Sequence, residues 1–129
     1  MRRISMLLML VGMLVFAVGP ALAATPEIIV ESPKDGGTIQ GGLVAVKYAV
    51  KNFKIVDFTK DPSVSETQGH IHIQLDQNPA NTIHTVSNVW VFAGVKPGPH
   101  TLKLWLVHSD HSPLKEKVEK TLDFTVAAQ

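Results

Sequence analysis

Apolar and polar residues alternate along most of the chain beyond residue 24, with the two-residue period of a β-strand. The clearest case is residues 70–76, where Ile71, Ile73 and Leu75 alternate with polar residues. Successive side chains of a strand point to opposite faces, so these three share one face. Burying each of them is worth about 1.5 to 3 kcal/mol, which predicts that this face points into a core.

Besides a weaker candidate at 53–58, the same pattern predicts strands at residues 27–31, 43–50, 70–76, 88–93, 100–108 and 118–126. Turn-forming residues occupy 32–37, after the first strand, and 96–99, before the strand at 100–108. The polar stretches between the other strands are predicted to be loops, and no segment has a convincing helical period. About seven short strands with turn signals about a dozen residues apart predict an all-β fold, an antiparallel β-sandwich of immunoglobulin-like architecture.

The first 23 residues have a different pattern. Arg2 and Arg3 precede an apolar run over residues 6–18, and Ala21-Leu22-Ala23 provides a small-x-small cleavage site. These features are typical of a secretory signal peptide. We therefore expect cleavage after Ala23, a single β-sandwich domain over residues 24–129, and a periplasmic or secreted location.

Composition narrows the possible partners of residues 24–129. This segment has no Met, Arg or Cys, and its ten lysines face eleven carboxylates, a formal net charge of −1 with neutral histidines. Nucleic acids and anionic membranes bind concentrated positive charge, so neither is an expected partner. No second apolar run of about 20 residues follows the first, which predicts no transmembrane segment after cleavage.

Histidine is the residue type with an unusual distribution. Five of the six histidines lie in three short motifs, at residues 69–72, 99–102 and 108–113. His70 and His72 are two apart on a predicted strand, a rise of about 6.6 Å on one face. Imidazoles at that spacing can converge on one cation at about 2.0 to 2.1 Å from each nitrogen.

Further ligands would have to come from another segment. If the strands at 70–76 and 100–108 are antiparallel neighbours, the residues after the second strand lie beside His70. The predicted metal site therefore comprises His70, His72, His108, Asp110 and His111. Without a sulfur ligand, copper(I) is disfavoured and copper(II), zinc or nickel is the expected class of ion, with zinc or copper(II) as the leading choice.

The remaining histidines and the tryptophans have structural interpretations. His84 stands alone in a polar connection, and His100 shares parity with the leucines of its strand, so we interpret it as a partly buried turn residue. Trp90 and Trp105 could form a sugar-stacking platform, although large aromatics in a sandwich more often fill the core. Trp105 lies opposite the leucine face, which makes it the better candidate for an exposed ring.

Catalytic motifs are largely missing. The sequence has no Gly-x-Ser-x-Gly elbow, no cysteine nucleophile, no His-Glu-x-x-His helix and no phosphate-binding glycine loop. No catalytic residue and no organic cofactor are therefore predicted.

Three motifs carry a resemblance over nearly all of residues 24–129. The segments Gly69-His70-Ile71-His72, Pro97-Gly98-Pro99-His100-Thr101-Leu102 and Asp110-His111-Ser112-Pro113 resemble small exported bacterial domains of unknown function. The resemblance implies an exported immunoglobulin-like domain and selects His70, His72, His100, Asp110 and His111 for testing. The chain is also similar to copper-zinc superoxide dismutase in its His-x-His strand, but it lacks that family's cysteines, arginine and long glycine-rich loops.

The leading hypothesis is an exported non-catalytic β-sandwich that binds a divalent transition metal through its histidine cluster. The alternative is a cell-envelope interaction or adhesion module, which binds a protein or glycan and uses its histidines structurally. A small metalloenzyme similar to superoxide dismutase is a third reading, and it has the least support from the residues.

Overall fold

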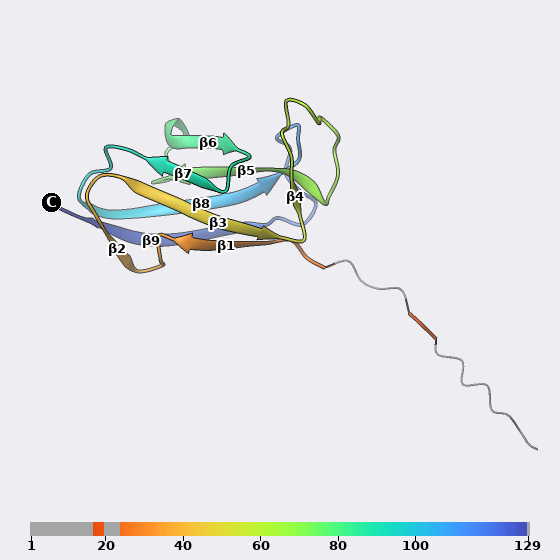
Figure 1. Ribbon diagram of the computed structural model, residues 1–129, viewed down its shortest axis with the longest axis horizontal. Coiled ribbons are helices and arrows are strands. Elements are labelled where there is room, and N and C mark those ends of the chain that lie inside the picture. Colours follow the sequence, from red (N-terminus) through yellow and green to blue (C-terminus); the bar gives the residue numbers. More distant parts are fainter. Residues whose placement is uncertain (1–16, 20–23, 129) are drawn as a thin grey trace, which may run out of the picture.

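The computed structural model describes residues 17–19 and 24–128. The predicted signal peptide falls mostly on residues outside these ranges. In the described part of the chain, no helix is long and apolar enough to cross a membrane. The strands form two sheets that pack against each other (Figure 1).

The smaller sheet has three antiparallel strands. Its order is β1-β3-β7, with β3 in the middle. The strands are β1 (Glu27–Ser32), β3 (Val44–Lys51) and β7 (Val89–Phe92).

The larger sheet contains the longest strands and has the order β2-β9-β8-β5-β4. A further strand, β6, pairs antiparallel with β5. A single 3-10 turn, η1 (Pro79–Asn81), precedes β6. The strands are β2 (Gly37–Gln40), β9 (Glu119–Ala127), β8 (Gly98–Val107), β5 (Gln68–Leu75), β4 (Lys54–Ile55) and β6 (Thr82–Thr85).

The core lies between the two sheets and follows the alternation of the sequence. Ile71 and Ile73 of β5 are fully buried, as are Leu102 and Leu104 of β8. From the other sheet, Val44, Val46 and Tyr48 of β3 join the same cluster. The predicted all-β sandwich is confirmed, and the residues expected on its inner faces are there.

Two short strands were not predicted. β2 and β6 each contain a single large apolar residue, Ile39 and Ile83, which is too little to give a period. They are held instead by pairing with the long strands β9 and β5. β2 and β4 run parallel to their partners, so the sheet is not purely antiparallel as predicted.

The weaker candidate strand at 53–58 reduces to β4. The Val56 amide still donates to the Gly69 carbonyl, but the Asp57 carboxylate then accepts from the Thr59 amide and side chain. A side chain that bonds to the backbone two residues on favours a turn, which ends the strand here.

Strands β5 and β8 are antiparallel neighbours, as the metal hypothesis required. His70 lies opposite Val107 in their register. The loops that follow β4 and β8 meet at this end of the sheet, where β4 and both loops are visible together (Figure 1). Glu66 of the first loop accepts from the Lys115 amide of the second. These loops cover part of the outer face of β5.

Gly69 is required by the close approach of β5 to β8. A Cβ atom at this position would lie 1.9 Å from the Val107 carbonyl oxygen. We expect Gly69→Ala to lower the free energy of unfolding by more than about 2 kcal/mol, because backbone must move to relieve the clash. Urea unfolding measures this loss.

Gly94→Ala is the matched control for that prediction. Gly94 has a positive φ of 68° but no atom within 4 Å of an added Cβ. Gly94→Ala is expected to lower the free energy of unfolding by about 1 kcal/mol, from backbone strain alone. Equal losses in the two variants would show that the contact with Val107 does not matter.

Candidate metal centre

His70 and His72 lie on the outer face of β5, opposite the core residues Ile71 and Ile73. Outer faces are normally solvated, yet His70 is 0% exposed and His72 is 7% exposed. The Phe58 ring covers His70 at a centroid distance of 4.2 Å, and Trp105 of β8 packs edge-on against His72 at 5.1 Å. The two imidazoles are therefore held in a largely dry environment.

The loop after β8 brings a third histidine to this pair. His111 adopts a left-handed backbone conformation, with φ of 68°, inside a turn in which its amide donates to the His108 carbonyl. Its Nδ1 atom lies 2.9 Å from His70 Nε2 and 3.3 Å from His72 Nε2. The His70 and His72 Nε2 atoms are 3.2 Å apart. Three ring nitrogens thus form a compact triangle.

His84 of β6 is the fourth member of the cluster. It lies directly opposite His72 in the register of β5 and β6, and the two rings stack at 3.9 Å with an interplanar angle of 8°. One nitrogen from each of the four histidines lies within 4.8 Å of the others. His84 and His111 are exposed, whereas His70 and His72 are buried.

The triangle cannot be satisfied by hydrogen bonds alone. Each nitrogen of a neutral imidazole is either a donor or an acceptor. Among three nitrogens in mutual contact, at least two must be in the same state, so at least one contact joins two donors or two acceptors. A shared cation removes this conflict, because it accepts all three lone pairs at once.

The spacing of the triangle fits a transition metal. Two nitrogens bound at about 2.0 to 2.1 Å are about 3.3 Å apart in a tetrahedral site and about 2.9 Å apart at a right angle. The three observed separations of 2.9, 3.2 and 3.3 Å cover this range. The donors are neutral imidazoles without sulfur or carboxylate, which suits zinc or copper(II).

Burial favours the neutral forms of His70 and His72. Desolvation, followed by the neighbouring charges of His111 and His84, lowers the pKa of His70 to about 4. Desolvation, followed by the charges of His84, His70 and His111, lowers the pKa of His72 to about 3. Only neutral imidazole ligates, so neither residue would have to lose a proton to bind an ion at neutral pH.

One buried atom of the cluster has no partner. The Nδ1 atom of His70 makes no hydrogen bond. A buried polar atom without a partner costs about 1 to 3 kcal/mol. Such a cost is expected where a residue serves a function rather than stability.

His108 and Asp110 lie outside the cluster. His108 Nε2 is 2.9 Å from Glu66 Oε1 and its Nδ1 is 2.9 Å from Ser112 Oγ. Asp110 accepts from the amide and hydroxyl of Ser112. Both residues hold the turn that presents His111. Of the five histidines and aspartates predicted to form the site, the structure brings together His70, His72 and His111.

His84 is the residue that the sequence did not indicate. The sequence predicts an isolated histidine in a polar connection, because β6 is too short to show a period. Its position opposite His72 is set by the turn at residues 76–81, which returns the chain to β5. The sequence does not show that residues 82–85 pair with β5.

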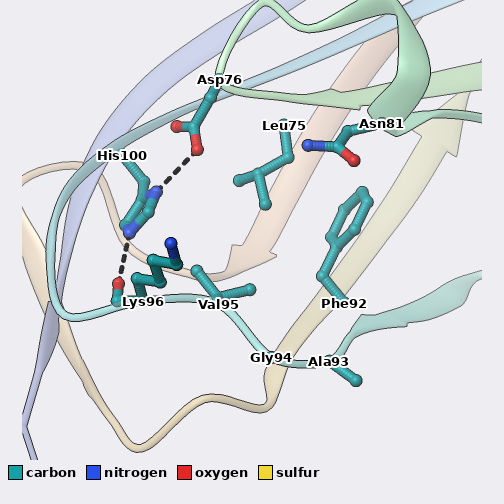
Figure 2. A pocket seen from close by; sticks show the side chains of 9 residues that line it. All are labelled: Leu75, Asp76, Asn81, Phe92, Ala93, Gly94, Val95, Lys96 and His100. Carbon is teal, nitrogen blue, oxygen red and sulfur yellow. Dashed lines mark hydrogen bonds and ion pairs between the residues drawn. The ribbon is translucent and has the colours of Figure 1, made fainter.

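His100 lies at the other end of β8, beside a cavity of about 260 Å³ (Figure 2). Its Nδ1 is 2.8 Å from Asp76 Oδ2, and its Nε2 is 2.6 Å from the Lys96 carbonyl oxygen. Both partners are acceptors, so the protonated form of His100, with two N–H donors, satisfies both contacts. Burial lowers the pKa of His100, but the hydrogen bonds to Asp76 and Lys96 outweigh it and raise the pKa.

Asp76→Asn tests this arrangement. A raised folded-state pKa gives stability that is present below about pH 6.5 and is lost as pH rises through the folded value. We expect the free energy of unfolding of the variant to fall by about 1 kcal/mol at pH 5.5 and by less at pH 8. We also expect the variant to have a lower His100 pKa, which NMR measures. Asparagine tolerates the positive φ of 57° at this position, so backbone strain is not added. An equal loss at both pH values would contradict the charged pair.

Comparison with known proteins gives a family and a fold. The sequence matches, over residues 16–129, a family described as "Family of unknown function (DUF6130)". No curated protein is similar to it.

Solved structures are similar in fold. The fibronectin(III)-like modules of CbhA from Clostridium thermocellum give a TM-score of 0.52 at 18% identity, covering 77% of this chain and 93% of that one. The endo-beta-1,4-mannanase from Thermotoga petrophila gives 0.51 at 12% identity, covering 81% of this chain and 20% of that one. An engineered protein gives 0.55 at 12% identity, covering 82% of this chain and 21% of that one.

The chain therefore spans about a fifth of the length of the mannanase and of the engineered protein. At such low identity the likeness shows the fold alone. It confirms the predicted immunoglobulin-like architecture, shared with fibronectin type III modules.

Proposed function

The chain belongs to this family of unknown function, and from its own side chains we propose that it is an exported, non-catalytic β-sandwich that binds one divalent transition metal ion. The ligands are His70, His72 and His111. This set is narrower than the sequence prediction, because His108 and Asp110 are engaged with Glu66 and Ser112.

The observation that carries the proposal is the triangle of ring nitrogens. Its three edges of 2.9 to 3.3 Å are those of a site with metal bonds of about 2.0 to 2.1 Å. Its hydrogen bonds cannot all form, and two of its members are buried with lowered pKa values. The hydrogen-bond conflict costs stability without an ion and is removed by one, and the lowered pKa values keep both ring nitrogens free of protons at neutral pH.

Export is part of the proposal because of the first 23 residues. The basic start, the apolar run and Ala21-Leu22-Ala23 support a signal peptide and a periplasmic or secreted protein. Imidazole nitrogens suit zinc and copper(II), and neither ion needs a thiol.

A calorimetric titration tests metal binding. Protein purified without a histidine tag and stripped with chelator is titrated with zinc and with copper(II) at pH 7.5. We expect one ion per chain, bound more tightly than about 1 μM, as metal sites with three histidines allow. Heats no larger than those of dilution for both ions would overturn the proposal.

A second candidate is an interaction or adhesion module that binds an envelope protein or glycan. Val89, Trp90 and Val91 are exposed along β7, which is an edge strand of the smaller sheet. Exposed apolar residues on an edge are typical of binding surfaces. Partners recovered from envelope extract equally with and without chelator, and lost with Trp90→Ser, would favour this function.

Trp105 does not add to that surface. It is half-buried between His72 and the Lys103 side chain, whose Nζ lies 5.0 Å from its ring centroid. Its role in the described structure is to cover His72.

A further inference from the structure

We infer that the metal centre is open: the ion held by His70, His72 and His111 keeps one coordination position for a small exogenous Lewis base, beside which His84 lies without ligating. This inference rests on the proposed function, because it concerns the same ion. It adds a ligand class, water and small anions, to the proposed site.

The stacking of His84 on His72 excludes both from one ion. The lone pair of an imidazole nitrogen lies in the plane of its ring, so a bound ion lies close to that plane. The two planes are nearly parallel, 8° apart, with centroids separated by 3.9 Å. An ion halfway between them would lie up to about 2 Å from each plane, a displacement comparable to a whole zinc–nitrogen bond. If His72 binds the ion, His84 cannot bind the same ion.

No other side chain of the described residues completes the site. The group that could hold an ion consists of the four histidines alone and contains no carboxylate. Two acidic residues of the covering loops are engaged elsewhere, since Glu66 binds His108 and Lys115, and Asp110 binds Ser112. The protein therefore supplies three nitrogen ligands.

Solvent reaches the cluster from one side. His111 and His84 are exposed, while His70 and His72 are buried beneath Phe58 and Trp105. The Phe58 ring also lies against His111, at a centroid distance of 5.1 Å. Because aromatic rings crowd the ion on the buried side, a ligand that enters from solvent has to be small.

Three protein ligands with a free position is the arrangement that keeps water or another exogenous molecule on zinc, whereas closed four-ligand sites do not. The exposed ring of His84 can donate or accept a hydrogen bond to a molecule bound there. His84 is accordingly a positioning residue for the exogenous ligand and not a metal ligand.

Cobalt(II) and azide provide the test. The untagged, stripped protein is loaded with cobalt(II), whose visible absorption depends on its coordination, and then titrated with azide. We expect saturable spectral changes in the wild type. His84→Ala is expected to bind cobalt(II) within about threefold of the wild type and to bind azide several-fold more weakly. Glu116→Gln, at an exposed residue of the same loop outside the cluster, is the matched control and should change neither value.

The outcomes are distinct. A spectrum that azide does not change overturns the open position. If azide has no effect and His84→Ala lowers cobalt(II) affinity tenfold or more, His84 is the fourth ligand of a closed site. If azide has no effect and His84→Ala keeps the affinity of the wild type, another group fills the position, such as a donor from a second copy. If the wild type binds no cobalt(II), the proposed function itself is wrong, and this result does not depend on azide.

Discussion

Replacing His70 and His72 together by alanine is expected to lower zinc affinity by at least about 1000-fold. The double variant removes two of the three nitrogens of the triangle, and the loss of one hydrogen-bond partner behind a metal ligand already costs about 10- to 100-fold in affinity. Competition with a chromophoric chelator at pH 7.5 measures the change.

A milder variant separates ligation from folding. His111 is exposed and has a positive φ that asparagine tolerates, so His111→Asn removes one ligand without opening the core. We expect a loss of at least about 30-fold with an unchanged thermal midpoint for the metal-free protein. The midpoint follows from a thermal scan with chelator present.

Asp110→Asn and His108→Gln are the controls for these losses. Asp110→Asn is expected to stay within about threefold of the wild type, and His108→Gln to lose at most about tenfold through the turn that presents His111. A loss in either as large as that of the double alanine variant would restore the wider ligand set that the sequence suggests.

The metal-free protein is expected to lose on the order of 3 kcal/mol of unfolding free energy as pH falls from 6.5 to about 4. Burial first, and neighbouring histidine charges second, lower the folded-state pKa of His70 to about 4 and that of His72 to about 3. In this window the unfolded chain binds protons that the folded chain does not, so stability falls with pH. Urea unfolding at several pH values, with chelator present, measures the slope.

A variant with glutamine at both positions, H70Q/H72Q, isolates the source of that slope. Glutamine does not titrate, so the fall between pH 6.5 and 4 should become markedly shallower. His100 contributes with the opposite sign and above pH 6.5, because its pKa is raised, so it does not mask the effect. Equal slopes for the two proteins would show that the acid response comes from other groups.

The long strands and the core were predictable because their signal is local. Ile71, Ile73 and Leu75 alternate with polar residues, and the structure buries all three. β6 escaped prediction because four residues with one large apolar side chain have no period, and its place depends on pairing with β5.

The candidate site was predicted in part for the same reason. His70 and His72 are two apart on one strand, a spacing that the sequence states directly. Whether His108 or His111 joins the cluster depends on how one turn is folded. In this turn Glu66, 42 residues away in the chain, binds His108, and His111 faces His70 and His72. The burial of His70 beneath Phe58 likewise comes from a loop whose path the sequence does not reveal.

The triangle also joins distant parts of a chain that has no cysteine. His70 and His111 are 41 residues apart, and one lies on a strand while the other lies on a loop. A shared ion would act as a reversible cross-link between them. Opening of the loop at residues 108–118 would then require the ion to leave, so proteases should cut there more slowly in the presence of metal. The residence time of the ion would set how often this end of the sandwich opens.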